Sequence, residues 1–378
     1  MRKKVVINAA NLSVGGGLQV ALSFISEMSK LNTDHLDIVL LCSEELSKLV
    51  SDKLTFGKVY VFKKGKFPTP VSLNIFYRHV EKAEMPSIWF SIFGPIYYRP
   101  KCMHLEGFAN PWVIYPDSIA FSRLKIIKRV RSRIKYYLYK RCFLREGDHF
   151  VVEATHVKNQ LNSVLKVNCR DVSIVPNTAS SIYFDKEKWL YRVLPNFNDD
   201  TFKFITIAHP YSHKNLEEIV YLKEYLSSQG IAATFYVTMP DNIYRGMGLA
   251  FIDATENLGV LKPAECPSIY LQCDALFLPT LLECFSASYV EAMTLGLPIV
   301  CTDFSFNRDI CEDAACYFEY RGDYQSIKRM ILDPIYRESL VKKGLVISSR
   351  QINANQRAIE YLKLITENLN ETNLTKHS

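Results

Sequence analysis

The sequence predicts an α/β protein with parallel sheets, divided into two main domains. Short apolar, strand-like runs alternate with helix-like patterns almost throughout the chain, as expected for strand–helix–strand units. The length of 378 residues suggests two or three domains, and a hydrophobic fraction of 48% is ample for packed cores. A polar and aromatic stretch from residue 177 to 200 separates the strand candidates into two sets.

The strand candidates are short runs rich in β-branched and aromatic residues. In the first half they are Val5–Ile7, Ile38–Leu41, Val59–Phe62, Ile88–Phe93, Trp112–Ile114, Phe150–Val152 and Ser173–Val175. In the second half they are Phe204–Ile207, Ala233–Val237, Ala275–Leu278, Ile299–Cys301 and Ala315–Phe318. We therefore expect an N-terminal domain over residues 1–178, a connection over 179–200 and a C-terminal domain over 201–352.

Composition favours a cytoplasmic protein that lacks disulfides and structural zinc. No run approaches the roughly 20 apolar residues of a membrane span, and the apolar run after the basic start Met1-Arg-Lys-Lys is too short for a signal peptide. Ten cysteines occur without C-x2-C spacing, which suits a reducing compartment. His209 and His213 are four apart, but Pro210 between them argues against a helical pair of metal ligands.

The stretch from residue 278 to 300 carries the clearest functional pattern. It predicts a buried strand, a loop with Glu283, a helix from about Ser286 to Leu295 with Glu291 in it, and another strand. Eight residues at roughly 1.5 Å each separate the two carboxylates by about 12 Å. The free N–H groups of the helix start, near Phe285 and Ser286, favour a diphosphate. A nucleotide-sugar has this layout, because hydroxyls of a sugar and of a ribose flank its diphosphate.

The pattern Glu283 … Glu291-Ala-Met … Gly296-Leu-Pro298 resembles the acid-x7-acid signature of retaining glycosyltransferases of group 1, which is a family 4-like group with the GT-B architecture. The resemblance is strong from about residue 204 to 318 and thin in the first half. It implies two facing Rossmann-like domains, with helices on both faces of each sheet and a ligand cleft between the domains. It also implies that the last segment, 353–378, packs its helix back on the N-terminal domain. Glu283 would hold the transferred sugar and Glu291 the ribose.

Other donor-site residues follow from the same resemblance. Lys214-Asn215 matches a pair whose lysine neutralises the donor diphosphate as the leaving group departs. Many relatives carry an arginine five residues before that lysine, and this chain has His209 there, so the expected phosphate clamp is weaker. Gly259 and Val260 stand where backbone groups usually hold the base.

The first domain contributes two candidates. Gly15, Gly16 and Gly17 form a glycine-rich turn after the first strand, which lets the backbone approach a ligand and expose N–H groups. It is neither G-x-G-x-x-G nor a P-loop. The resemblance implies that this loop lies near the donor phosphates. His104, before a glycine-containing turn, matches a histidine near the transferred sugar in such enzymes, although a lone histidine is as often structural; Glu106 is a weaker candidate.

Residues 123–145 contain ten Lys and Arg and no acid, which leaves 36 basic against 39 acidic residues elsewhere. On a helical wheel, Ile127, Val130, Ile134 and Leu138 form an apolar stripe. The cations on the other side and its flanks are Lys125, Lys128, Arg129, Arg133, Lys135 and Lys140. Such a helix suits an anionic membrane surface, where each cation contributes about 1 kcal/mol. Alternatively, the stripe packs on the sheet and the cations are merely solvated. No nucleic-acid recognition motif accompanies the charge.

Together these features predict a retaining, hexosyltransferase-like glycosyltransferase that uses a nucleoside-diphosphate sugar. The acceptor would be a saccharide, lipid-linked or part of a surface polysaccharide, and the enzyme would be peripheral on the inner face of the membrane. No D-x-D occurs in the sequence, so neither a metal nor another cofactor is expected. Two alternatives remain: a nucleotide-sugar epimerase on the same architecture, and a non-catalytic homologue that holds membrane or nucleic acid.

Overall fold

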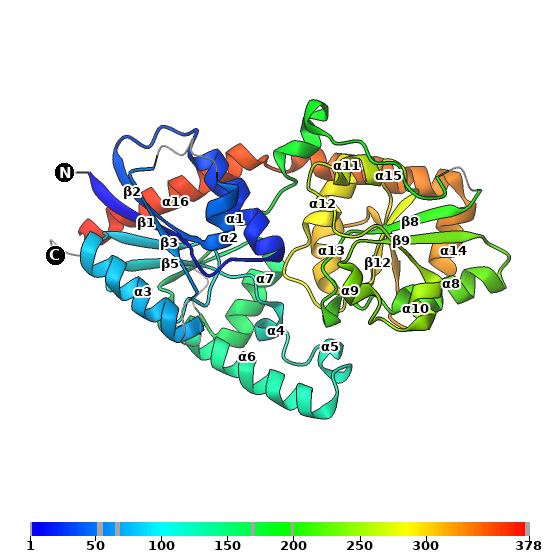
Figure 1. The fold of residues 1–378 in the computed structure, drawn as a ribbon, viewed down its shortest axis with the longest axis horizontal. Helices are drawn as coiled ribbons and strands as arrows, with labels where there is room; N and C mark the ends of the chain where they lie inside the picture. Colours follow the sequence, from blue (N-terminus) through cyan, green and yellow to red (C-terminus); the bar gives the residue numbers. More distant parts are fainter. Residues whose placement is uncertain (1, 51–55, 65–68, 168–170, 198–199, 375–378) are drawn as a thin grey trace. The chain divides into compact units, whose positions relative to one another are not determined.

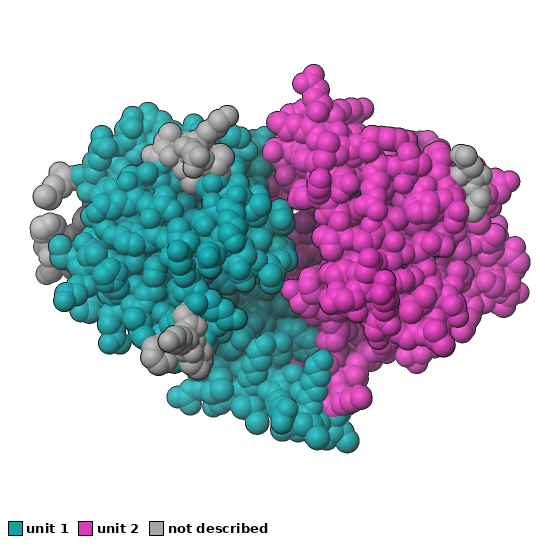
Figure 2. Space-filling view, in the orientation of Figure 1, with its two compact units in different colours: residues 1–116, 126–177, 352–378 teal, residues 117–125, 178–351 magenta. Residues whose placement is uncertain are grey.

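The computed structural model describes residues 2–50, 56–64, 69–167, 171–197 and 200–374, and it divides the chain into two compact units (Figure 1). Unit 1 comprises residues 1–116, 126–177 and 352–378, and unit 2 comprises residues 117–125 and 178–351 (Figure 2). Each unit has its own sheet, and all strand pairs formed by the described residues are parallel. Both units are therefore α/β structures, as the alternation of patterns predicted.

The sheet of unit 1 has seven strands in the order β3-β2-β1-β4-β5-β6-β7. They are β1 (Lys3–Ala9), β2 (Leu36–Ser43), β3 (Lys58–Phe62), β4 (Ile88–Ser91), β5 (Met103–Gly107), β6 (His149–Val152) and β7 (Val172–Ile174). The helices are α1 (Gly15–Met28), α2 (Glu44–Leu49), α3 (Thr69–Glu84), α4 (Pro111–Ile114), α6 (Ile126–Glu146), α7 (Thr155–Gln160) with a π-helical turn (Leu161–Leu165), and α16 (Ala354–Leu374). The strand order reverses beside β1, which is where ligands bind in such sheets.

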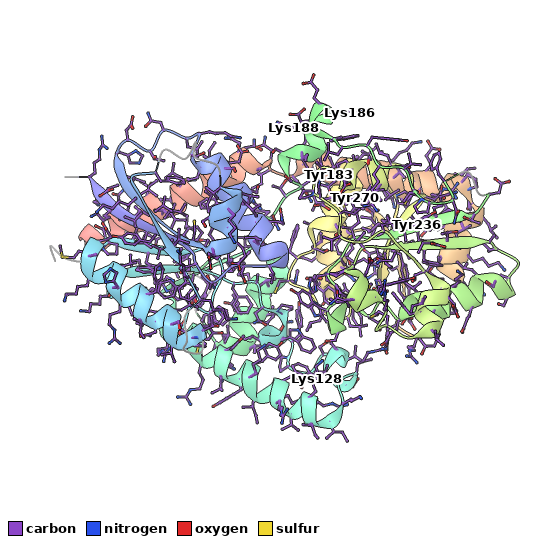
Figure 3. All side chains as sticks on the ribbon, in the orientation of Figure 1. Lys128, Tyr183, Lys186, Lys188, Tyr236 and Tyr270 are labelled. Carbon is purple, nitrogen blue, oxygen red and sulfur yellow. The ribbon has the colours of Figure 1, made fainter. Side chains whose placement is uncertain are left out.

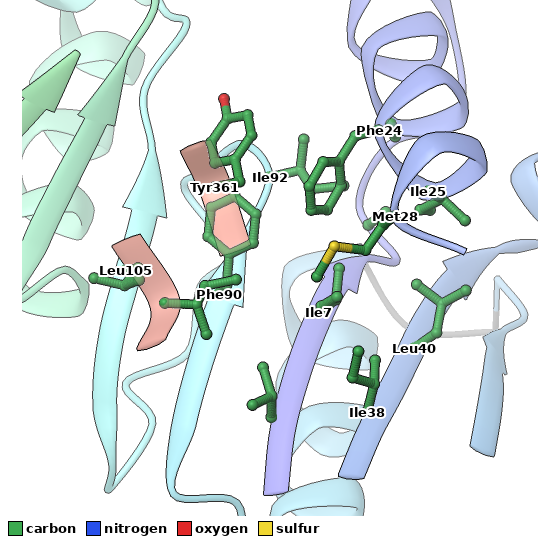
Figure 4. Packing of buried hydrophobic residues seen from close by; sticks show 14 of the residues in the cluster. Ile7, Phe24, Ile25, Met28, Ile38, Leu40, Phe90, Ile92, Leu105 and Tyr361 are labelled. Atoms are coloured by element: carbon green, nitrogen blue, oxygen red, sulfur yellow. The ribbon is translucent and has the colours of Figure 1, made fainter. Parts of the chain in front are cut away.

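Helices cover both faces of this sheet because β1 buries side chains in both directions. Val5 and Ile7 pack beneath α1 and α16, while Val6 packs on the other face with Tyr77 of α3. Under α1, Phe24, Phe90 and Tyr361 form an aromatic cluster with ring centroids 5.1–5.7 Å apart (Figure 4). The last helix, α16, thus belongs to the core of unit 1.

The sheet of unit 2 has six strands in the order β10-β9-β8-β11-β12-β13. They are β8 (Phe202–Thr206), β9 (Ala233–Val237), β10 (Glu256–Asn257), β11 (Ala275–Leu278), β12 (Ile299–Thr302) and β13 (Ala315–Phe318). The helices are α5 (Ile119–Ser122), α8 (Glu218–Ser228), α9 (Asp241–Tyr244), α10 (Leu249–Ala254), α11 (Cys266–Tyr270), α12 (Ala287–Thr294), α13 (Ser305–Cys311), α14 (Gln325–Leu332) and α15 (Pro334–Arg350), with 3-10 turns at Ser181–Phe184, Lys186–Lys188 and Ser212–Lys214. Alternate residues of β11 serve opposite faces: Leu276 and Leu278 pack under α11 and α12, and Phe277 packs under α8.

The strand prediction needs two corrections in unit 1. Trp112–Ile114 is helix α4, because Asn110 and Pro111 start a helical turn in which proline occupies the first position. Strand β5 was missed, and His104, expected before a turn, lies inside it. Its polar residues His104 and Glu106 are both fully buried, so the apolar pattern that marks other strands is interrupted. The short strand β10 was also missed.

Glu106 is an unusual buried carboxyl group. Its side chain is fully enclosed, and neither oxygen has a hydrogen-bond partner among the described residues. Two glycines make room for it, since a Cβ added at Gly94 would lie 2.0 Å from Oε1 and one at Gly147 would lie 2.8 Å from Oε2. Burial, and then the nearby Glu146, raise the pKa of Glu106 well above its usual range. Glu106 therefore keeps its proton to a higher pH in the folded protein than in the unfolded chain.

We expect Glu106→Gln to stabilise the protein increasingly as pH rises. Because the folded-state pKa is raised, the stability of the parent protein falls as pH increases above the ordinary pKa of about 4.5, by up to roughly 1.4 kcal/mol per pH unit until the folded pKa is reached. The amide cannot ionise, so the variant escapes this loss. The difference in unfolding free energy, measured by urea denaturation from pH 5 to pH 9, should grow with pH.

Glu84→Gln is the matched control, and it should lower the free energy of unfolding where Glu106→Gln raises it. Burial disfavours the Glu84 carboxylate, but hydrogen bonds from Tyr60, Lys4 and Lys58 outweigh it and lower the pKa of Glu84 to about 2. This variant should therefore be less stable than the parent at neutral pH, and the deficit should shrink as pH falls from about 4.5 towards 2. A difference for Glu106→Gln that does not change with pH would contradict a raised pKa of Glu106.

Candidate functional site

Two predicted residues meet at the carboxyl edge of the sheet of unit 2. Lys214 follows β8 and Glu283 follows β11, and these strands are parallel neighbours, so the segments after them emerge side by side. Lys214 Nζ lies 2.5 Å from Glu283 Oε2, and both side chains are nearly buried, with 12% and 11% exposed. The two segments are also joined through the His213 carbonyl, which accepts the Leu281 N–H at 2.8 Å. The pair is a preformed, charge-compensated contact.

The start of helix α12 lies directly after Glu283. The N-cap residue Ser286 makes no side-chain hydrogen bond to the first turn, so no side-chain cap occupies the N–H groups there. Ser288 donates its hydroxyl to the Ile207 carbonyl at 3.1 Å, which ties the first turn to the end of β8. Phe285 packs partly buried against the core. The positive end of the helix dipole is thus held beside Lys214 and Glu283.

Gly296 of the motif ends this helix. Its φ of +69° is left-handed, and the N–H groups of Leu297 and Gly296 bond back to the carbonyls of Ala292 at 2.9 Å and Met293 at 3.1 Å. This arrangement is a glycine-terminated helix end, in which a side chain at Gly296 would be strained. The Gly-Leu-Pro part of the motif therefore has a structural role.

Glu291, on α12, is partly buried beside two tyrosines. The Tyr270 hydroxyl donates to Glu291 Oε2 at 3.2 Å, and the Tyr183 hydroxyl lies close to the same carboxyl group. The two rings lie next to each other, with centroids 6.2 Å apart (Figure 3). Burial raises the pKa of Glu291 to about 7, although both phenols favour the charged form. Its carboxyl group therefore changes ionisation near neutral pH.

His209, at the position where the family resemblance implies an arginine, does not carry that positive charge. Its ring stacks on Tyr211 at 4.1 Å, and Tyr211 stacks on His213 at 5.6 Å. Burial lowers the pKa of His209, and burial together with the charge of Lys214 lowers that of His213 to about 3. Both imidazoles are therefore neutral at neutral pH, and Lys214 provides the positive charge of this loop.

Asn215 has a structural contact, and its assignment to donor binding stays a prediction. It is buried and adopts a left-handed conformation with φ +52°, a region that asparagine tolerates better than most residues. Its side-chain amide donates to Glu218 Oε2 at 3.0 Å, and Glu218 also accepts the Tyr324 hydroxyl at 2.7 Å. Asn215 thus shapes the turn that presents Lys214.

Gly259 and Val260 follow the edge strand β10. Gly259 has φ +71°, and its N–H donates to Asn257 Oδ1 at 3.2 Å, while the side chain of Val260 is exposed. The carbonyl of the preceding residue, Leu258, accepts the guanidinium of Arg192 at 2.6 Å. The loop is therefore accessible at Gly259 and Val260, whereas Leu258 is buried and its carbonyl is held by Arg192.

The glycine-rich turn of unit 1 lies at the carboxyl end of β1. Gly15 has φ +69° and begins α1, and the N-cap Val14 makes no side-chain hydrogen bond. A Cβ added at Gly16 would have nothing within 4 Å, whereas one at Gly17 would contact Leu12 and Phe93. Gly15 is required by its backbone conformation, and Gly16 faces open space.

His104 is a structural residue, which corrects its assignment as catalytic. It is fully buried in β5, and both ring nitrogens are engaged: Nδ1 lies 2.8 Å from the Glu146 carbonyl and Nε2 lies 2.9 Å from Ser91 Oγ. Burial lowers the pKa of His104 to about 4. A neutral, enclosed imidazole without a free nitrogen cannot contact a sugar.

Helix α6 turns its apolar stripe outwards, so the interpretation in which the stripe packs on the sheet is wrong. Ile127, Val130, Ile134 and Leu138 are between 53% and 70% exposed. The opposite side packs on unit 1 through aromatic contacts of Tyr136 with Trp112, Tyr139 with Tyr97, and Phe143 with Phe108. Aromatic rings bury more area than the stripe residues, which explains the orientation.

The cations of the basic segment divide between the two sides. Lys128 (Figure 3) and Arg133 are exposed on α6, and Lys125, just before it, is also exposed. Lys135 lies over the rings of Tyr136 and Tyr139 at 5.2 Å. Lys140 and Arg129 are partly buried, and Lys140 donates to the Val164 carbonyl at 2.5 Å, so Lys140 is removed from the outward-facing set.

The described residues contain neither a membrane-spanning helix nor a metal-binding cluster. No helix among them is both long enough and apolar enough to cross a bilayer. Within the same residues, no group of three or more His, Cys, Asp or Glu side chains has the proximity needed to hold a metal ion.

Three residues near the predicted site were not identified from the sequence: Tyr183 and Tyr270, which lie beside Glu291, and Arg192, which holds the residue before Gly259. Tyr183 and Arg192 lie in the segment that composition marks as an interdomain connection. Tyr270 is an ordinary apolar-face residue of α11 by its spacing. No motif signals any of the three, because their contacts arise only from the fold.

Comparison with known proteins gives a family match over part of the chain and a shared fold. Residues 250–363 match the family model described as glycosyl transferases group 1, and no curated protein sequence matches the chain significantly. The structure is similar to sucrose-phosphate synthase from Thermosynechococcus elongatus, with 13% identity, complete coverage of both chains and a TM-score of 0.69. It is similar to WaaG, a glycosyltransferase involved in lipopolysaccharide biosynthesis, with 11% identity, coverage of 96% and 99% and a TM-score of 0.69. It is also similar to Anabaena HepE in complex with UDP and glucose, with 11% identity, coverage of 97% and 100% and a TM-score of 0.65.

The chain thus has the GT-B fold, with two α/β units that each contain a parallel sheet. The predicted resemblance to group 1 glycosyltransferases is confirmed. The family match includes β11, α12 and both Glu283 and Glu291. These findings support glycosyl transfer as the activity.

We expect His104→Ala to destabilise the protein without weakening its affinity for nucleoside diphosphates. The substitution removes one hydrogen bond each from Ser91 and the Glu146 carbonyl, which keep Asn8 and Arg99 as partners, and creates a cavity, which should cost roughly 2–4 kcal/mol of unfolding free energy. Urea unfolding and calorimetric nucleotide titration at low temperature measure the two effects. The exposed His79→Ala should change neither. Lost nucleotide binding at unchanged stability would restore a role for His104 in the site.

Proposed function

We propose that this protein is a retaining glycosyltransferase that moves a hexose from a nucleoside-diphosphate sugar to a saccharide acceptor. The observation that carries the proposal is the Lys214–Glu283 pair beside the open start of α12, with Glu291 on the same helix. The pair supplies a cation for a diphosphate and a carboxylate for sugar hydroxyls. The match of residues 250–363 to glycosyl transferases group 1 supports this assignment.

The donor competes with an existing contact. In the free protein Lys214 is neutralised by Glu283 at 2.5 Å. A donor diphosphate attracts Lys214 and the N–H groups near Phe285 and Ser286, which releases the Glu283 carboxylate to accept hydroxyls of the transferred sugar. Glu291 accepts ribose hydroxyls, and Gly259 and Val260 contact the base. In unit 1, we retain Gly15, Gly16 and Gly17 as proposed donor contacts.

The reaction needs one bond broken and one formed. The bond from the sugar C1 to the diphosphate oxygen breaks, the acceptor oxygen bonds to C1 on the same face, and the acceptor proton passes to the leaving phosphate oxygen. Lys214 and the α12 dipole stabilise the charge that develops on the leaving group. We propose no metal or other cofactor in this step, because the sequence offers no D-x-D pair to hold a metal–diphosphate complex.

The acceptor is proposed to be lipid-linked, or part of a surface polysaccharide, and used at the inner face of a membrane. Helix α6 supports this through its outward apolar stripe and the exposed cations Lys128 and Arg133. An apolar stripe with flanking cations binds an anionic bilayer by burying the stripe at the headgroup level. The protein would then be peripheral on the cytoplasmic side.

The epimerase and the non-catalytic alternatives differ from transfer in their products. The fold alone does not separate them, and the family match favours transfer. An epimerase would release altered sugar without an acceptor, whereas a non-catalytic homologue would bind without turnover. Incubation of the protein with a panel of radiolabelled nucleotide-sugars, with and without membrane extract, separates the three by whether label becomes free sugar, extractable glycolipid or neither.

We expect Glu283→Gln to abolish transfer while leaving nucleoside-diphosphate binding intact or tighter. The amide cannot compete for Lys214, so the lysine is free for the diphosphate, but the transferred sugar loses its carboxylate. Turnover should fall at least about 100-fold, and Lys214→Ala should instead weaken diphosphate affinity about 10- to 100-fold. Calorimetry with UDP, GDP and ADP, together with a transfer assay, measures both.

The exposed Glu224→Gln on α8 is the matched control and should behave like the parent. Unchanged turnover in Glu283→Gln would remove Glu283 from the mechanism. Diphosphate affinity that falls equally in Glu283→Gln and Lys214→Ala would contradict the competition between donor and carboxylate.

We expect α6 to bind vesicles that contain anionic phospholipid. Replacing Lys128 and Arg133 together by glutamate removes two cations at about 1 kcal/mol each, so vesicle affinity should fall at least about 30-fold and become less sensitive to salt. Co-sedimentation with phosphatidylglycerol vesicles at several salt concentrations tests this. Lys64→Glu with Lys363→Glu, two exposed cations outside α6, is the charge-matched control. Equal loss in both double variants would show that only net charge matters.

A further inference from the structure

The connecting segment, residues 179–197, is folded onto unit 2. Tyr183 and Leu194 are buried in the core of that unit. The Leu190 N–H donates to the Ala264 carbonyl at 2.8 Å, and the Leu194 N–H donates to Gln272 Oε1 at 3.0 Å. The Tyr236 hydroxyl donates to the Pro195 carbonyl at 2.6 Å. These contacts fix the segment along its length, so it is part of the architecture of unit 2.

One anchor of this segment reaches Glu291. Tyr183 lies in the first 3-10 turn of the segment, its ring lies 6.2 Å from that of Tyr270, and its hydroxyl lies close to the Glu291 carboxyl group that accepts Tyr270 at Oε2. The phenols favour the charged form of the carboxyl group, against the burial that raises its pKa. Tyr183 thus influences both the direction and the ionisation of Glu291.

A second anchor holds the loop that carries Gly259 and Val260. Arg192 donates its Nη2 to the Leu258 carbonyl at 2.6 Å. Its own backbone is fixed on both sides, because its carbonyl accepts Gln272 Nε2 at 2.7 Å and its N–H donates to Ser268 Oγ at 3.3 Å. The guanidinium is therefore a rigid support beneath an otherwise accessible loop.

We propose that the connecting segment completes the nucleoside end of the donor site, with Tyr183 orienting Glu291 for the ribose and Arg192 setting the position of the Leu258–Val260 loop for the base. This inference rests on the proposed function. Both are positioning residues: they act through Glu291 and the loop, and they leave the diphosphate to Lys214 and α12. A molecule without a nucleoside should therefore be insensitive to them.

The test compares two probes, a nucleoside diphosphate and inorganic pyrophosphate, in calorimetric titrations. The base is first chosen by the strongest binding of UDP, GDP or ADP to the parent protein. Tyr183→Phe and Arg192→Gln should each weaken nucleoside-diphosphate affinity about tenfold and leave pyrophosphate affinity unchanged. In the transfer assay, KM for the donor should rise and kcat should stay within a factor of about two.

A pH profile distinguishes positioning from general damage. Nucleotide affinity should fall as pH drops through the pKa of Glu291, about 7, because a protonated carboxyl accepts fewer ribose hydrogen bonds. Removing the Tyr183 hydroxyl raises that pKa, so in Tyr183→Phe the fall should begin at higher pH. Tyr98→Phe, which removes an equivalent hydroxyl bonded to buried Glu81 at 2.6 Å in unit 1, should leave the midpoint unchanged.

The possible outcomes separate this inference from the proposed function. If the parent binds nucleotides and the two variants bind them equally well, the positioning role is wrong and the proposed function stands. If both variants lose pyrophosphate binding to the same extent as nucleotide binding, the segment acts on overall folding and the inference is also wrong. If the parent binds neither probe, the proposed function fails and this inference fails with it.

Discussion

The contact between Lys214 and Glu283 organises the carboxyl edge of unit 2. Each charge is almost withdrawn from water, and a nearly buried charge is stable only with a partner, so each residue requires the other. The pairing is possible because β8 and β11 are parallel neighbours and because the left-handed Asn215 turns the chain after Lys214. The start of α12 is tied to β8 through Ser288, which brings its dipole to the same place. Strand order, turn and helix start thus converge on one ion pair.

The strand pattern could be predicted from sequence wherever strands were apolar, and the misses have physical causes. Trp112–Ile114 has strand-like composition, but the preceding Pro111 fits the first turn of a helix. Strand β5 lacks the apolar pattern of a buried strand because His104 and Glu106 are polar and yet buried. Hydrogen bonds accommodate His104, and the nearby Gly94 and Gly147 leave room for Glu106. Helix α6 was placed correctly, but a helical wheel cannot decide which side packs when aromatic residues occupy the opposite side from the aliphatic stripe.

Some residues of the candidate site could be predicted from the sequence and others could not. Glu283, Glu291 and the α12 start were readable because they lie within one short stretch whose spacing is fixed by helix geometry, and Lys214 follows a recognisable strand. Tyr183 and Arg192 were not readable, because the contacts with Glu291 and Leu258 join segments far apart in the chain. Asn215 and His104 show the converse: each matches a functional position, but the surrounding groups, Glu218 for one and Ser91 with Glu146 for the other, engage its side chain.

Helix α16 has a consequence for synthesis of the protein. Tyr361 closes the aromatic cluster with Phe24 and Phe90, and the buried Arg357 hydrogen-bonds Asn177 and Ser23. These partners are translated before the main part of unit 2, residues 178–351, whereas α16 is translated after it. Domains generally fold as units during synthesis, so unit 2 can form its core while the ribosome is still at work. Unit 1 must keep the apolar surface around Phe24 and Phe90 uncovered throughout that interval. The half of the protein that emerges first is thus the half that matures last.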